Sequence, residues 1–241
     1  MTPATQSPEF ILMLTKNDAT VPDALKRVKE VTNPEVRIIG FKDVGLNKSS
    51  LGELANAIRS QGRKVALEVV SLDEAAELRS VEMALALQVD LLLGGTRADK
   101  VVELLRGTDT LYFPFPGRVI GHPSTLLGAL SEIVEDARRL TAIHGVSGLD
   151  LLAYRHPAEN PEELIAAVVR AVAQPVIVAG SINSSARVAS IASSGAWGFT
   201  VGSAALDCEF APNKPRLGDQ VDTILAARNP MTSRIQQHAK V

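Results

Sequence analysis

Two short apolar runs near the C-terminal end of the chain finish in the same Gly-Ser step. PVIVAG ends at Gly180 and is followed by Ser181, and GFTVG ends at Gly202 and is followed by Ser203. Glycine lets backbone N–H groups approach an anion closely, and the serine hydroxyl groups add further donors. One such step is an ordinary turn, but two at the ends of neighbouring strands predict a phosphate site. Its expected residues are Gly180, Ser181, Ile182, Gly202, Ser203 and Ala204.

Glu68 interrupts VALEVV, a run that is otherwise apolar and typical of a buried strand. A buried carboxylate needs a partner, or its pKa rises until it is protonated. Either state suits a general base or acid, and an ionised Glu68 could also bind a metal ion such as Mg²⁺. The alternative is a structural salt bridge.

Lys42 follows the apolar run VRIIGF directly and is followed by Asp43. Its ammonium group could neutralise a carboxylate or phosphate of a substrate, or, if desolvated, form a Schiff base with a carbonyl group. The alternative is an exposed loop lysine paired with Asp43. Lys16, in LTKND, is a weaker case of the same kind.

Other polar residues stand where the chain leaves further apolar runs. Histidine transfers protons near neutral pH, although a loop histidine is often incidental, and arginine grips carboxylates and phosphates. We take Lys16 and His156 as additional catalytic candidates beside Glu68 and Lys42. The substrate-binding candidates are Asp18, Thr96, His122 and Arg155.

These residues must be positioned by the elements that precede them. Apolar, β-branched runs alternate with stretches of helical spacing along the whole chain. We expect strands at 10–15, 36–41, 64–70, 90–95, 110–115, 149–154, 175–180 and 198–202. Eight strands alternating with eight helices in 241 residues predict a single α/β domain, a (β/α)₈ TIM barrel. A doubly wound open sheet is the alternative, because alternation alone does not prove closure.

Boundary signals support this organisation. Ser71 with Glu74 predicts a capping box, and Asn160-Pro161-Glu162 predicts a helix start. The longest irregular stretch, 113–125, contains several prolines and glycines and is expected to form a loop over the site. No interior linker is visible, so we expect one domain over 1–241, with tails at 1–9 and 229–241.

Composition limits the partners. The formal net charge is −2, so no broad basic field is expected to attract nucleic acid or an anionic membrane. Cys208 is the only cysteine, which excludes a disulfide within the chain and a thiolate metal cage. The N-terminus resembles no signal peptide and no apolar run reaches the ~20 residues of a membrane helix. We therefore expect a cytoplasmic protein.

The stretch from PVIVAGSIN to GAWGFTVGSAALD resembles the ending of the ribulose-phosphate-binding barrel superfamily. That group includes histidine- and tryptophan-biosynthesis barrels, ribulose-phosphate epimerase, and the keto-gulonate-phosphate decarboxylase and hexulose-phosphate synthase group. The resemblance is specific over 175–207 and architectural elsewhere. It implies a phosphorylated, usually sugar-derived small-molecule substrate, but no particular reaction.

The resemblance does not extend to the decarboxylase group's Asp-x-Lys-x-x-Asp run. Ala66, Glu68 and Ser71 stand at those three positions, so metal and enediolate chemistry is not carried over from it. LDLLAYRH lacks the strand-six lysine of Schiff-base aldolases. Asp18 matches the strand-one aspartate of the isomerases only loosely, since it stands four residues beyond Leu14.

The leading functional prediction is proton abstraction next to a carbonyl group of a phosphorylated, sugar-like or carboxylate-bearing compound. A carbon–carbon lyase, an aldolase or a decarboxylase, is preferred, with a sugar-phosphate isomerase or epimerase as the alternative. A non-catalytic barrel that senses a phosphorylated metabolite is a second class. Flavin mononucleotide bound through its phosphate is not expected, and Mg²⁺ is left open. Barrels of this superfamily are often homodimers, so a homodimer is left open too.

Overall fold

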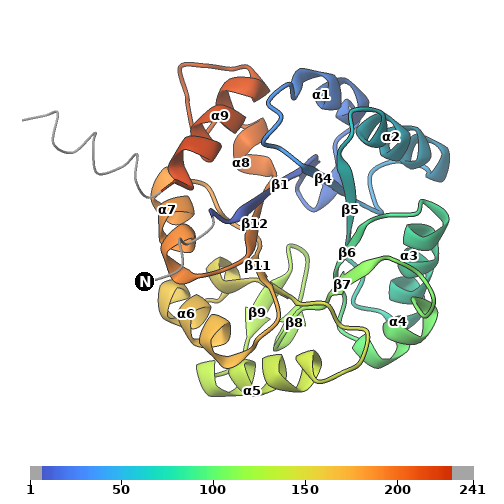
Figure 1. The fold of residues 1–241 in the computed structure, drawn as a ribbon, viewed down its shortest axis with the longest axis vertical. Helices are drawn as coiled ribbons and strands as arrows, with labels where there is room; N and C mark the ends of the chain where they lie inside the picture. The colour runs from blue at the N-terminus through green and yellow to red at the C-terminus, as the bar shows by residue number, and fades with distance from the viewer. Residues whose placement is uncertain (1–6, 230–241) are drawn as a thin grey trace, which may run out of the picture.

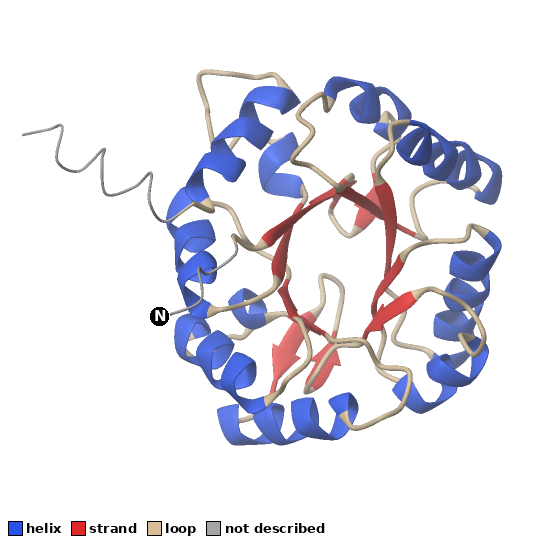
Figure 2. Ribbon diagram, viewed as in Figure 1, coloured by secondary structure: helices blue, strands red, loops and turns tan. Residues whose placement is uncertain are grey.

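The protein was analysed as a computed structural model, which describes residues 7–229. Eight parallel strands form one sheet in the order β10-β11-β12-β1-β4-β5-β6-β7. Seen down the short axis, they form a ring enclosed by helices (Figures 1 and 2). The strands are β1 (Glu9–Met13), β4 (Ile38–Lys42), β5 (Lys64–Val69), β6 (Leu91–Gly94), β7 (Leu111–Phe113), β10 (Leu149–Leu151), β11 (Val176–Val178) and β12 (Gly198–Val201).

The ring closes between β7 and β10 through irregular contacts instead of a regular ladder. Tyr112 and Val146 form an isolated parallel bridge. The backbone N–H of Ser147 donates to the carbonyl oxygen of Tyr112 at 2.8 Å, and that of Asp150 donates to Pro114 at 3.0 Å. The expected (β/α)₈ barrel is confirmed, and the open-sheet alternative is wrong.

Helices cover the outer face of the ring. They are α1 (Ala24–Glu30), α2 (Lys48–Ser60), α3 (Glu74–Ala86), α4 (Ala98–Leu104), α5 (Leu130–Thr141), α6 (Pro161–Ala171), α7 (Ser185–Ser194), the short α8 (Ser203–Leu206) and α9 (Leu217–Ala227), with a 3₁₀ turn η1 (Ala153–Arg155). No helix in the described part of the chain is long and apolar enough to cross a membrane.

The core has two layers because side chains alternate between the two faces of each strand. The larger layer lies between strands and helices and includes Leu149 and Leu151. A smaller cluster fills the inside of the ring: Ile11, Met13, Ile38, Ala66, Leu91, Leu93, Phe113 and Ile177. Continuing the same period from Ile38 and Ala66 brings Lys42 and Glu68 to the inner face, at the carboxyl ends of β4 and β5.

The segment expected to be an irregular loop, 113–125, contains regular structure. β8 (Arg118–Ile120) and β9 (Thr125–Leu127) form an antiparallel hairpin, which Figure 1 shows beside the barrel opening. A second hairpin, β2 (Thr15–Lys16) with β3 (Ala19–Thr20), follows β1. Both are short, so their alternation is too brief to be recognised from sequence.

Element boundaries were predicted with mixed success. Asn160 caps α6 as expected, since its side chain accepts from the backbone N–H of Glu162 at 2.9 Å. The capping box at Ser71 is wrong, because Asp73 caps α3 by accepting from Ala76 at 3.0 Å. β1 begins at Glu9, within the expected tail 1–9, and Asn229 is the last described residue; residues 1–6 and 230–241 lie outside the description.

Candidate active site

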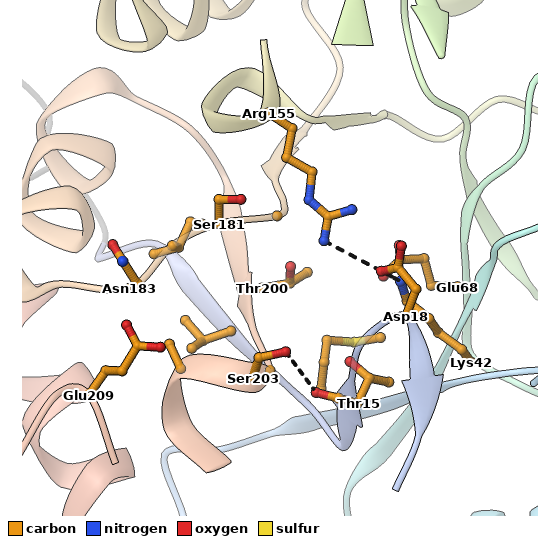
Figure 3. A pocket seen from close by; sticks show the side chains of 16 residues that line it. Thr15, Asp18, Lys42, Glu68, Arg155, Ser181, Asn183, Thr200, Ser203 and Glu209 are labelled. Atoms are coloured by element: carbon orange, nitrogen blue, oxygen red, sulfur yellow. Dashed lines mark hydrogen bonds and ion pairs between the residues drawn. The ribbon is translucent and has the colours of Figure 1, made fainter. Parts of the chain in front are cut away.

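A cavity of about 290 Å³ opens at the carboxyl ends of the strands. All six residues of the predicted phosphate site line it, together with Lys42, Glu68, Asp18 and Arg155 (Figure 3). The remaining lining residues are Met13, Thr15, Asn183, Thr200, Val201 and Glu209. The structure therefore brings the two Gly-Ser steps and the two strongest catalytic candidates to one cavity.

Lys42 lies between two carboxylates. Its ammonium group donates to Asp18 Oδ1 at 2.6 Å and lies 3.1 Å from Glu68 Oε1, with about 4% of its side chain exposed. Burial alone would lower the pKa of Lys42, but the charges of Glu68 and Asp18 outweigh burial and raise that pKa. Lys42 is therefore a protonated cation at neutral pH, which suits it to hold an anionic oxygen and not to form a Schiff base.

A two-residue turn brings Asp18 to this lysine. Asn17 and Asp18, between β2 and β3, both have positive φ angles of 51° and 56°, a conformation that Asn and Asp adopt more readily than most residues. Thr20 fastens the returning strand, because its hydroxyl group accepts from the backbone N–H of Lys42 at 2.9 Å and donates to its carbonyl at 2.7 Å. The hairpin thus folds Asp18 back over the end of β4.

Arg155 makes the second cationic contact with Asp18. Its Nη2 lies 3.5 Å from Asp18 Oδ1, and its Nη1 donates to the carbonyl oxygen of Ser124 at 3.2 Å. The backbone N–H of Ser124 donates to Asp18 Oδ2 at 3.3 Å. Burial would raise the pKa of Asp18, but Lys42, Arg155 and this N–H lower it overall. The chain just before β9 therefore helps to hold the charged cluster.

Both Gly-Ser steps need glycine for steric reasons. Gly180 has a φ of +76°, and a Cβ there would lie 2.4 Å from Nε of Arg155. A Cβ on Gly202 would lie 2.8 Å from Oγ1 of Thr15. The first glycine leaves room for the arginine beside the cavity, and the second lets β12 pass close to the β1–β2 connection.

The serines of these steps have different surroundings. The backbone carbonyl of Ser181 is engaged by the guanidinium group of Arg187 on α7, which also stacks over the ring of Tyr154 at 4.7 Å from its centroid. Ser203 begins α8, and its hydroxyl group lies 3.5 Å from the carbonyl oxygen of Thr15. Both residues line the cavity, as expected for the phosphate site.

Four sequence candidates are not among the residues that line this cavity. Lys16 is exposed and paired with Asp207. Thr96 is bound to Glu77 of α3, to which it donates its backbone N–H at 2.9 Å. His122 is exposed in the turn between β8 and β9. His156 donates from Nε2 to the carbonyl oxygen of Gly128 at 2.9 Å, while its Nδ1 accepts from Glu159 at 2.8 Å.

Sequence reasoning passed over Asp150, a fully buried residue in the middle of β10. The sequence did contain a signal for Asp150, of the same kind that pointed to Glu68. Asp150 is a carboxylate within an apolar run, LDLL. Asn183, Thr200 and Glu209 at the cavity were missed as well. Their residue types are common in loops and strand ends, so no comparable signal marked them.

The neighbour that balances the charge of Glu68 is a lysine. Within residues 7–229, no three His, Cys, Asp or Glu side chains converge in a way that could hold a metal ion. The ammonium group of Lys42 already stands beside Glu68, in the place where a cation would balance its charge.

No protein-family model matches the chain. No curated protein matches it either. Many solved structures do resemble it in three dimensions. The chain is a TIM barrel. A chain of tryptophan synthase from M. tuberculosis matches with a TM-score of 0.64 and 16% identity, covering 92% of this chain and 93% of that one.

Two further solved structures show the range of proteins with this fold. N-acetylmannosamine-6-phosphate 2-epimerase from Clostridium perfringens matches with a TM-score of 0.59 and 14% identity, over 85% of this TIM barrel and 89% of the epimerase. FabK from Thermotoga maritima matches with a TM-score of 0.57 and 17% identity, over 83% of this chain. The chain spans 59% of the length of FabK. Likeness at these identities establishes the fold alone.

Proposed function

We propose that this TIM barrel is an enzyme that forms an enolate from a phosphorylated, sugar-like or carboxylate-bearing carbonyl compound. The observation that carries the proposal is that both Gly-Ser steps and the Lys42–Glu68 pair line the same cavity of about 290 Å³. In barrels of this kind, phosphate commonly sits at the loops after the last two strands, and catalytic groups come from the ends of several strands. Backbone N–H groups of both steps would hold the phosphate.

The chemical step requires a base and a cation beside the reacting carbonyl group. Glu68 would take a proton from the carbon next to the carbonyl, so that the C–H bond breaks and an O–H bond forms on the carboxylate. The electron pair would move to the carbonyl oxygen, where Lys42 would hold the negative charge. A buried cation placed where charge develops is worth more than one in water. The protonated state of Lys42 supports this role.

An enolate leads to more than one product. In a carbon–carbon lyase, the preferred reading, the bond that breaks is a C–C bond. In aldol cleavage Glu68 would take the proton of the hydroxyl group two carbons from the carbonyl carbon, so that an aldehyde or ketone leaves, and in decarboxylation the substrate carboxylate would leave as CO₂. In both cases the electron pair moves to the carbonyl oxygen, where Lys42 would hold the enolate. In an isomerase or epimerase, Glu68 would return the proton to carbon. The name of the epimerase from Clostridium perfringens shows a sugar phosphate handled on this fold and supports the second reading.

The experiment is thermal stabilisation by phosphorylated sugars and acids, each compared with its unphosphorylated twin and with Mg²⁺ present or absent. A ligand at a hundredfold excess over its Kd adds about 2.7 kcal/mol to the free energy of unfolding. We expect only phosphorylated compounds to raise the Tm. Hits are then assayed for turnover by product analysis, which separates cleavage from isomerisation. Equal stabilisation by both twins would overturn the phosphate assignment, and binding without turnover would favour the sensor.

A further inference from the structure

Asp150 is a carboxyl group on the inner face of the barrel. It is the central residue of β10, and none of its surface is exposed. Leu149 and Leu151, on either side of it, both belong to the layer between strands and helices. Because side chains alternate along a strand, Asp150 projects toward the inside of the ring.

Neither carboxyl oxygen of Asp150 has a hydrogen-bond partner among the described residues. Glu77, another carboxyl group with no exposed surface, shows what a structural role looks like in the same molecule. It accepts from the backbone N–H groups of Thr96 and Arg97 at 2.9 and 3.0 Å, and from the Arg97 side chain at 2.7 Å. A buried carboxylate without such contacts is strongly disfavoured, so Asp150 is not a structural carboxylate of this kind.

The charges at this end of the barrel can be counted. Apart from Glu209, which also lines the cavity, the connected charges are three carboxyl groups, Asp18, Glu68 and Asp150, and two cations, Lys42 and Arg155. Asp18 contacts both cations and Glu68 contacts Lys42, whereas no ion pair is formed by Asp150 among residues 7–229. Two cations balance two carboxylates, and the third carboxyl group, the one without a contact, has to carry a proton.

Electrostatics agrees with this count. Burial and then the negative charge of Glu68 raise the pKa of Asp150 well above its usual range, and the positive charges of Lys42 and Arg155 oppose the shift without cancelling it. The groups that act on Asp150 therefore come from β5, β4 and η1, the same elements that form the cavity.

We propose that Asp150 makes the site sensitive to pH: its carboxyl group is uncharged while the enzyme works, and its ionisation would place a second negative charge near Glu68 inside the barrel. This inference rests on the proposed function. When Glu68 takes a proton from the substrate, one negative charge moves from its carboxylate to the enolate oxygen, and the total charge of the cluster stays constant. A second interior carboxylate would oppose that charge and compete for Lys42, so loss of the Asp150 proton would stop turnover.

The test compares wild type with Asp150→Asn and Asp150→Leu, two uncharged side chains of similar size. We expect both variants to keep kcat within about threefold of wild type near neutral pH. In wild type, kcat should fall as rising pH ionises Asp150, and in both variants this alkaline limb should disappear or move toward the ionisation of Lys42. A large loss of kcat at every pH, or an unchanged alkaline limb, would overturn the proposal.

A stability measurement tests the inference even if no substrate turns over. The folded state holds a proton on Asp150 that the unfolded chain releases above about pH 4, so wild type loses stability as pH rises toward the folded pKa. The Tm of Asp150→Asn should therefore increase relative to that of wild type as the pH rises from about 5 toward the folded pKa of Asp150, by about 3 °C or more. Glu77→Gln, the matched buried control, should lower the Tm across this range. A constant difference between Asp150→Asn and wild type would overturn the inference, whereas failure of every ligand would overturn only the proposed function.

Discussion

Ser203 and Glu68 both line the cavity, on different strand ends, and would meet different parts of one substrate. Ser203 is exposed at the start of α8, beside the backbone amides of the Gly202 step. Glu68 is buried beside Lys42. Substitutions at these two positions should therefore separate binding of the anion from the chemical step.

Ser203→Asp should weaken binding of phosphorylated ligands by at least about tenfold, which corresponds to about 1.4 kcal/mol. The added carboxylate would repel the anion where the serine hydroxyl now lies. Titration calorimetry with the best ligand of the panel measures the change, and Ser203→Ala is the uncharged control, expected to lose much less. If Ser203→Asp binds as tightly as wild type, the phosphate does not rest at this step.

Glu68→Gln should lower kcat by about 10² to 10⁴-fold while ligand affinity changes little. The amide keeps the size of the side chain and an oxygen that accepts from Lys42, but it cannot take a proton from carbon. Steady-state kinetics and the ligand-induced Tm shift are measured on the same preparation. A fully active variant would remove Glu68 from the mechanism and return it to the salt-bridge interpretation.

At the scale of elements, the two hairpins beside the barrel opening complete the site. The β2–β3 hairpin delivers Asp18 to Lys42, and Ser124, just before β9, contacts both Asp18 and Arg155. The barrel strands alone would bring Lys42 and Glu68 together, because Lys42 and Glu68 are direct partners in the β4–β5 register. The hairpins add the second carboxylate and orient the arginine.

Thr20→Val should lower the free energy of unfolding by about 1–3 kcal/mol and weaken ligand binding. The valine is nearly the same shape, but it leaves the backbone N–H and carbonyl of Lys42 without the two contacts that Thr20 provides. Urea denaturation gives the stability, and Thr20→Ser, which keeps the hydroxyl group, should retain most of it. Unchanged stability in Thr20→Val would show that the two hydroxyl contacts contribute little, and a larger loss in Thr20→Ser than in Thr20→Val would show that the methyl packing of Thr20 matters more.

At the scale of the whole molecule, the buried pair of Asp18 and Lys42 links folding stability to pH. The folded pKa of Asp18 is lowered, so its contribution is present above about pH 4 and is lost as pH falls through that folded pKa. The folded pKa of Lys42 is raised, so its contribution is present below about pH 10 and is lost as pH rises through the folded value.

Asp18→Asn should therefore make the acid side of the stability curve shallower, since the variant has no carboxylate to protonate there. It should also reduce stability on the neutral plateau, because Lys42 and Arg155 lose a shared partner. Urea denaturation from pH 2.5 to pH 8 measures both effects. An acid limb with the wild-type slope would mean that other carboxylates dominate acid unfolding.

The sequence by itself determined the eight alternating strands and the place of the two Gly-Ser steps at strand ends, and it selected Glu68 and Lys42 as candidates. These follow from local signals: alternating apolar runs, glycine at strand ends, and a charge within or directly after an apolar strand. The phosphate assignment itself stays a prediction, although its six residues lie together at the cavity.

The tertiary structure alone decided which charges meet. Lys42 and Asp18 are 24 residues apart, and Arg155 and Asp18 are 137 apart, so no local pattern connects them. Thr96 is bound to Glu77 and does not line the cavity, and the burial of Glu77 depends on how α3 packs. The inward direction of Asp150 was equally hidden, because in a three-residue strand the face that points into the barrel is set by closure of the ring.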